Sequence, residues 1–125
     1  MIERILVAVD DSSPALAAAA FAVELASQVS AELRFVTVPD GGDPDAVLRH
    51  VDAMAGRAGV TSSTGVETTG THPYEAVLDA AVVWRADLVV MGKTDRRSTG
   101  RPYVGSQTEH LLEFAPIPVV VVPDP

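Results

Sequence analysis

The residues best suited to chemistry lie in one loop, between Gly92 and Ser106. Four of the nine basic residues of the chain fall within nine positions of this loop, although the whole chain carries a net charge of −8. They are Lys93, Arg96, Arg97 and Arg101. A basic cluster on an acidic protein favours an anionic ligand, which the rest of the surface would repel.

Backbone features of the same loop favour phosphate as that anion. Gly92, Gly100 and Gly105 allow backbone N–H groups to approach a ligand closely. Residues 106–108 open a predicted helix, whose free N–H groups and positive dipole end attract an anion. The loop is therefore interpreted as a phosphate site, and the alternative is a solvated, charged surface loop.

Alternating strands and helices must position this loop. Continuous apolar runs predict strands that are buried on both faces, and a stretch rich in Thr and Ser predicts a weak edge strand. Each of the first three helices has a proline near its start; Ser13 is the expected N-cap of the first, and Asp43 before Pro44 is the expected N-cap of the second. Trp84 and Phe114 are expected in the core. The predicted strands are 5–9, 32–38, 60–69, 88–91 and 119–122, and the helices are 14–29, 44–58, 73–84 and 106–114.

This alternation predicts a doubly wound, Rossmann-like α/β fold, with a parallel sheet and helices on both faces. Residues 1–125 are expected to form a single domain. In such sheets ligands bind beyond the carboxyl ends of the strands, where the strand order reverses. Two segments reach that edge from central strands, namely residues 10–13 and the loop after Gly92.

Composition argues against several other classes of function. With 17 acidic against 9 basic residues, the surface as a whole disfavours nucleic acid and anionic membranes. The chain has no cysteine, which excludes disulfide and thiolate chemistry. Its longest apolar run, residues 15–23, is far shorter than the about 20 residues of a membrane span. We expect a cytoplasmic protein.

No catalytic residue and no metal site is predicted. Asp10 and Asp11 could form a metal pair, but adjacent carboxylates after a strand more often provide one ligand contact and one turn or capping residue. The three histidines are not spaced as metal ligands. The chain contains no Gly-x-Ser-x-Gly motif and no evident pair of nucleophile and base.

Three segments carry a family signature. They are Ile-Leu-Val-Ala-Val-Asp-Asp-Ser at 5–12, Gly-Thr-His-Pro at 70–73, and the ending at 105–122, which opens Gly-Ser-Gln-Thr and closes in four valines. Together they resemble the universal stress protein family over essentially the full chain. ATP-binding members carry Gly, two residues, Gly, nine residues and then Gly-Ser or Gly-Thr. Here Gly92 and Gly105-Ser106 match that spacing, and Asp95 stands at the second glycine.

The resemblance implies strand order 3-2-1-4-5 and a site for ATP or another adenine nucleotide. Asp10 would accept hydrogen bonds from the ribose hydroxyls, and Ala8 and Val38 would border the adenine. The residues implied around the phosphates are Gly92, Thr94, Gly105, Ser106 and Gln107.

Asp95 alters the phosphate end of this implied site. A carboxylate beside a triphosphate is repulsive by roughly 1–4 kcal/mol at a few ångströms. Aspartate tolerates left-handed backbone better than most residues, and Mg²⁺ or Arg96 would neutralise its charge. The site is therefore expected to bind ATP weakly, to prefer AMP or ADP, or to bind the nucleotide together with a metal.

Three functions remain open at this stage. The leading one is a stress-response or signalling protein that binds a nucleotide without designed catalysis. The second is a nucleotide-free, dimeric protein–protein interaction module whose degenerate phosphate loop is only structural. The third is a slow ATPase, for which the sequence supplies no general base.

The last predicted strand, 119–122, also indicates a partner. It is apolar on both faces, yet the implied strand order places it at an edge of the sheet, where unpaired backbone groups invite pairing. Many members of the family dimerise by pairing their last strands. We therefore expect a homodimer formed through residues 119–122.

Overall fold

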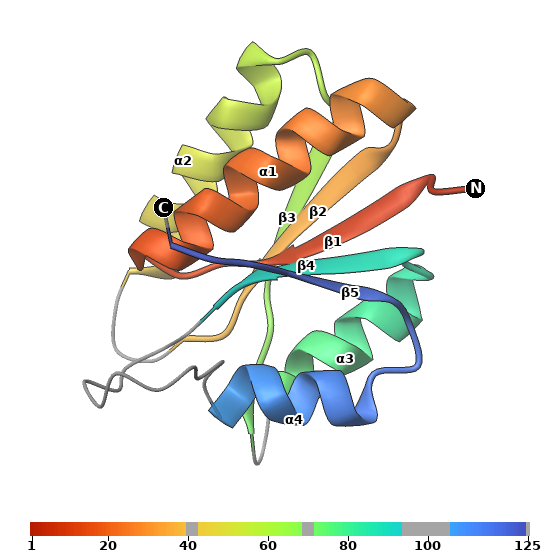
Figure 1. Cartoon of the computed structure of the whole chain (residues 1–125). Helices are drawn as coiled ribbons and strands as arrows, with labels where there is room; N and C mark the ends of the chain where they lie inside the picture. The colour runs from red at the N-terminus through yellow and green to blue at the C-terminus, as the bar shows by residue number, and fades with distance from the viewer. Residues whose placement is uncertain (40–42, 69–71, 94–105, 125) are drawn as a thin grey trace.

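In the computed structural model, which describes residues 1–39, 43–68, 72–93 and 106–124, a single parallel sheet forms the centre of the chain (Figure 1). Its strand order is β3-β2-β1-β4-β5, and every neighbouring pair is parallel, which confirms the predicted topology. The elements are β1 (Arg4–Ala8), α1 (Ser13–Val29), β2 (Glu32–Thr37), α2 (Pro44–Arg57), β3 (Ser62–Val66), α3 (Pro73–Trp84), β4 (Leu88–Gly92), α4 (Ser106–Phe114) and β5 (Val119–Val122).

Helices cover both faces of the sheet, so the core has two layers. In Figure 1, α1 and α2 lie on one side of the sheet and α3 and α4 on the other. Alternate residues of β1 enter the two layers: Ile5 and Val7 pack with α1 and α2, whereas Leu6 packs with α3 and α4. The central position of β1 explains its continuous apolar run, because a strand between two helical layers has no solvent face.

The first two helices begin at side-chain caps. Ser12, not Ser13, is the N-cap of α1, because its hydroxyl oxygen accepts a hydrogen bond from the backbone N–H of Ala15 at 3.3 Å. The helix therefore starts one residue earlier than predicted. Asp43 caps α2 as predicted, since its carboxylate accepts from the N–H groups of Asp45 and Ala46.

Most element boundaries differ from the prediction by a residue or two, and two strand boundaries and one burial differ in ways that the structure explains. β2 ends at Thr37, and β3 covers only Ser62–Val66 because Val60 still bonds back to Ala55 at the end of α2. Trp84 packs against the α3/α4 layer as expected, but Phe114 is 57% exposed. The Phe114 ring lies 6.1 Å from that of Tyr74, so it packs on the surface of α3 and not in the core.

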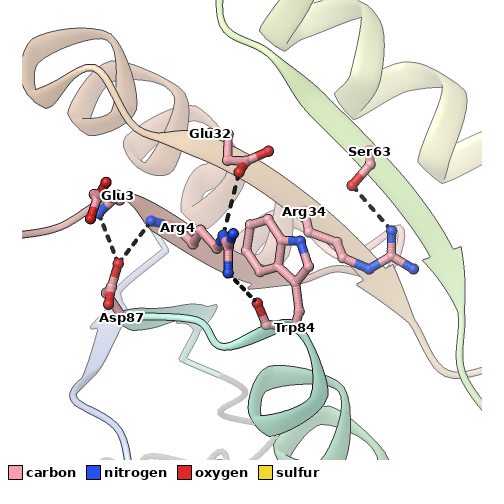
Figure 2. A network of polar contacts seen from close by, with 7 residues as sticks. All are labelled: Glu3, Arg4, Glu32, Arg34, Ser63, Trp84 and Asp87. Carbon is pink, nitrogen blue, oxygen red and sulfur yellow. Dashed lines mark hydrogen bonds and ion pairs between the residues drawn. The ribbon is translucent and has the colours of Figure 1, made fainter.

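A polar network joins the strands at the amino edge of the sheet (Figure 2). The carboxylate of Asp87 accepts hydrogen bonds from the backbone N–H groups of Glu3 and Arg4 at 2.8 and 3.0 Å. These bonds favour the ionised form and hold the pKa of Asp87 below its ordinary value. Arg4 also donates to the carbonyl of Trp84 and pairs with Glu32. The network thus links the starts of β1, β2 and β4 to the end of α3.

Candidate functional site

A small hollow lies at the opposite, carboxyl edge of the sheet, between the ends of β1 and β2 and the start of α2. It encloses about 30 Å³, much less than the roughly 300–1,000 Å³ of pockets that surround a whole small molecule. A nucleotide would therefore lie along this edge and place only part of itself in the hollow. The lining residues are Asp10, Asp11, Thr37, Val38, Pro39, Asp43, Pro44 and Val47.

Backbone pairing brings the two strand ends together at this hollow. Ala8, the last residue of β1, is paired with Val36 of β2. The N–H of Val9 then donates to the carbonyl of Val36 at 2.9 Å, which extends the pairing beyond β1. Asp10 and Val38, which are far apart in sequence, consequently line the same hollow. Ala8 is half-buried beside them but does not line it.

The adjacent carboxylates of Asp10 and Asp11 have different surroundings. Asp10 is half-buried, and its Oδ1 accepts a hydrogen bond from the backbone N–H of Ser12 at 2.8 Å, which tightens the turn into α1. Asp11 is exposed and lines the hollow without such a bond among the described residues. Asp10 therefore combines the turn role with a place in the hollow.

Gly92 ends β4 at the same edge, and the structure supplies a packing reason for this glycine. A Cβ built on Gly92 would lie 2.5 Å from the carbonyl carbon and oxygen of Pro14 and 2.8 Å from the nitrogen of Ala15. These are backbone atoms at the start of α1, so no small side-chain movement could relieve the contact. Close packing of β4 on α1 requires glycine at this position whether or not a ligand is bound.

Only part of the predicted phosphate end falls on the described chain. Lys93 is half-buried, and its backbone N–H donates to the carbonyl of Val122 at 2.8 Å. Ser106 and Gln107 begin α4, as predicted. Thr94, Asp95, Arg96 and Gly105 lie outside the described residues.

The lining of the hollow offers hydrogen-bond acceptors without cations. Asp10, Asp11 and Asp43 contribute carboxylates, and the buried side chain of Thr37 contributes a hydroxyl. Four further lining residues, from Val38 to Val47, are apolar. A surface of this kind suits a flat ligand with apolar faces and hydrogen-bond donors on its edge, which describes a nucleoside.

Sequence reasoning missed Asp43 and Thr37 as lining residues. Asp43 was recognised only as the cap of α2, and Thr37 only as part of a strand. The signal that could have found them was topological, because the residues after β2 must emerge at the same carboxyl edge as those after β1.

No cluster of three potential metal ligands occurs among the described residues. Among the described helices, none has the length and apolar character needed to cross a membrane.

The doubly wound parallel sheet places this chain among the Rossmann-like α/β proteins, and comparison with known proteins defines the family. The model of the Universal stress protein family matches residues 1–55 and 43–123. A universal stress protein of Thermus aquaticus, named for the QAH/OAS sulfhydrylase 3′ region, is 36% identical over 136 residues. That match covers 98% of this chain and 99% of the relative. The chain belongs to the universal stress protein family.

Solved structures with the same fold include complexes with nucleotides. A universal stress protein in complex with cAMP aligns with a TM-score of 0.81 and 22% identity, covering 99% of both chains. The universal stress protein of Archaeoglobus fulgidus in complex with dAMP aligns with a TM-score of 0.75 and 22% identity, covering 98% of both chains. At this identity the two structures establish the shared fold.

Proposed function

We propose that this universal stress protein binds an adenine nucleotide at the carboxyl edge of its sheet and acts in stress response or signalling. Part of the nucleoside would enter the hollow beside Asp10 and Val38, and the rest would lie along the edge of the sheet. The phosphates would extend toward Lys93 and the start of α4. The observation that carries the proposal is the hollow itself, which brings Asp10 and Val38 together at the carboxyl edge of the sheet.

Three further observations support this proposal. The two related structures with this fold were solved with cAMP and with dAMP, and both ligands contain adenine. The lining offers acceptors for ribose hydroxyls and apolar groups for the base. The start of α4 follows the basic loop in the sequence, and the N-terminus of a helix attracts phosphate.

We propose further that the protein acts by binding and not by catalysis. The described residues at the hollow include no histidine, lysine or cysteine, and the sequence shows no evident pair of nucleophile and base. Prolonged incubation with ATP and chromatographic measurement of ADP tests this. We expect the ATP to be recovered stoichiometrically, with ADP forming no faster than in buffer alone.

Titration calorimetry with ATP, ADP and AMP, with and without Mg²⁺, tests the binding proposal. Binding should fall in the micromolar-to-millimolar range and weaken as salt rises, because salt screens phosphate attraction. The variant Asp95→Gly should strengthen the binding of ATP more than that of AMP, since the repulsion by the Asp95 carboxylate grows with the charge of the phosphates. Absence of heat and of any thermal shift with millimolar nucleotide at low salt would favour the interaction-module function instead.

We propose that two copies of the chain form a homodimer by pairing their β5 strands. This strand lies at the edge of the sheet, and its four valines are all half-buried. Val120 and Val122 face the α1/α2 layer, whereas Val119 and Val121 face the α3/α4 layer. Pairing of two β5 strands would bury these side chains further and satisfy the exposed backbone groups of the edge.

A further inference from the structure

We infer that Thr37 is a specificity-determining residue of the proposed site, and that its hydroxyl binds the exocyclic amino group of the base. This inference rests on the proposed function, because it concerns the ligand of the same hollow. It depends on one buried polar side chain at the hollow that has no hydrogen-bond partner among the described residues.

The position of Thr37 directs its side chain into the hollow. Thr37 is the last residue of β2, and it is only 5% exposed. Side chains alternate along a strand, and Leu33 and Phe35 of β2 enter the α1/α2 layer. Thr37 therefore faces the same side of the sheet, where Pro44 and Val47 of α2 also line the hollow.

The Thr37 hydroxyl forms no hydrogen bond with any described residue. In the described part of the chain, every side-chain nitrogen or oxygen atom that is sealed from solvent has a partner. Because the Thr37 hydroxyl has none, it must remain in contact with open space, and the hollow is the open space that Thr37 lines. A ligand group that enters the hollow therefore finds this hydroxyl available.

The backbone holds Thr37 in place before any ligand binds. The carbonyl of Thr37 accepts a hydrogen bond from the backbone N–H of Glu67 at 2.9 Å. The carbonyl of Val36 accepts one from the N–H of Val9, also at 2.9 Å. These bonds join the end of β2 to the residues that follow β1 and β3. The hydroxyl is therefore preorganised, which lowers the ordering cost of binding.

The size and lining of the hollow indicate which ligand group reaches Thr37. Its volume of about 30 Å³ has room for a group the size of a water molecule, such as an amino group, and not for a whole ring. A threonine hydroxyl can accept a hydrogen bond from that group. The apolar residues Val38 and Pro39 follow Thr37 and also line the hollow, which suits the base more than the ribose. The ribose hydroxyls vary among adenine nucleotides, whereas the amino group of the base is common to all of them.

Titration calorimetry of the full chain with AMP and with purine riboside 5′-monophosphate tests the inference, because the second compound lacks only the amino group. The wild type should bind AMP about three- to tenfold more tightly than this analogue, which corresponds to one net hydrogen bond. Thr37→Val replaces the hydroxyl by a methyl group of similar shape. It should weaken AMP binding about three- to tenfold and leave binding of the analogue unchanged. Thr37→Ser keeps the hydroxyl and should retain the preference, and Thr37→Ala removes it if the valine variant does not fold.

Thr64→Val is the matched control, because it makes the same substitution at an exposed position of β3 that does not line the hollow. It should leave both affinities unchanged. Urea unfolding provides a second readout, in which Thr37→Val should be no less stable than the wild type, since its hydroxyl has no partner among the described residues to lose. A marked loss of stability would reveal an internal partner and overturn the inference.

The outcomes separate this inference from the proposed function. Equal affinities of the wild type for AMP and the analogue overturn the inference but leave the proposed function standing. The same holds if Thr37→Val weakens both ligands equally, or if Thr64→Val weakens AMP as much as Thr37→Val does. Absence of AMP binding to the wild type overturns the proposed function together with this inference.

Discussion

Gly92 ends β4 against the first turn of α1, and the contact leaves no room for a side chain. The Cβ of an alanine at this position would lie 2.5 Å from backbone atoms of Pro14. Ordinary contacts between heavy atoms are about 3.5 Å or longer, so α1 would have to retreat by about 1 Å. Neighbouring strands β1 and β5 hold β4 from both sides, so the strand cannot yield instead.

The cost of Gly92→Ala follows from this geometry. Overpacking a core costs typically about 1–3 kcal/mol, and the upper end applies here because the obstructing atoms belong to the backbone. A loss of about 3 kcal/mol lowers the melting temperature of a domain of this size by roughly 10 °C. Because the displaced turn carries Asp10 and Ser12, the substitution should also distort the hollow.

Urea unfolding measures this loss directly. Trp84 is the only tryptophan, so its fluorescence reports on the α3/α4 layer, and far-UV circular dichroism reports on the helices. Gly56→Ala is the matched control, because a Cβ on Gly56 meets nothing within 4 Å and the residue is exposed in α2. That control should gain about 0.5–1 kcal/mol from helix propensity. If the free energy of unfolding of Gly92→Ala lies within about 0.5 kcal/mol of the wild-type value, the packing explanation of this glycine is refuted.

Three other predictions concern the amino edge, the first helix and the dimer. The pKa of Asp87 is lowered in the folded protein. Its contribution to the free energy of unfolding is therefore present above the ordinary pKa of 3.8 and is lost as pH falls through the pKa of the folded state. Asp87→Asn should therefore reduce the free energy of unfolding more at pH 7 than at pH 3, and an equal reduction at both would contradict this. Ser12→Ala should cost about 1 kcal/mol in urea unfolding and Ser13→Ala less than half of that, since Ser12 is the cap. Light scattering should give twice the chain mass for the wild type and a mass near the monomer for Val121→Lys; a monomeric wild type would exclude the β5 dimer.

Much of the fold could be predicted because its signals are local. The apolar run of β1 and the Asp43-Pro44 start of α2 identify their elements from adjacent residues alone. The order of the strands is not a local property, and it came from the family resemblance. The same resemblance singled out Asp10 and Val38, which the structure brings to one hollow.

Other features were decided only by tertiary structure. Phe114 has a large apolar side chain of the kind expected in a core, yet its ring stacks on Tyr74 of α3 at the surface. Asp43 lines the hollow with Asp10 because parallel pairing brings the ends of β1 and β2 to one edge. The need for glycine at position 92 arises from the backbone of α1, nearly 80 residues earlier in the chain. Sequence patterns report which residues favour a strand, a helix or a turn, whereas these contacts depend on distances between segments that only the packed sheet establishes.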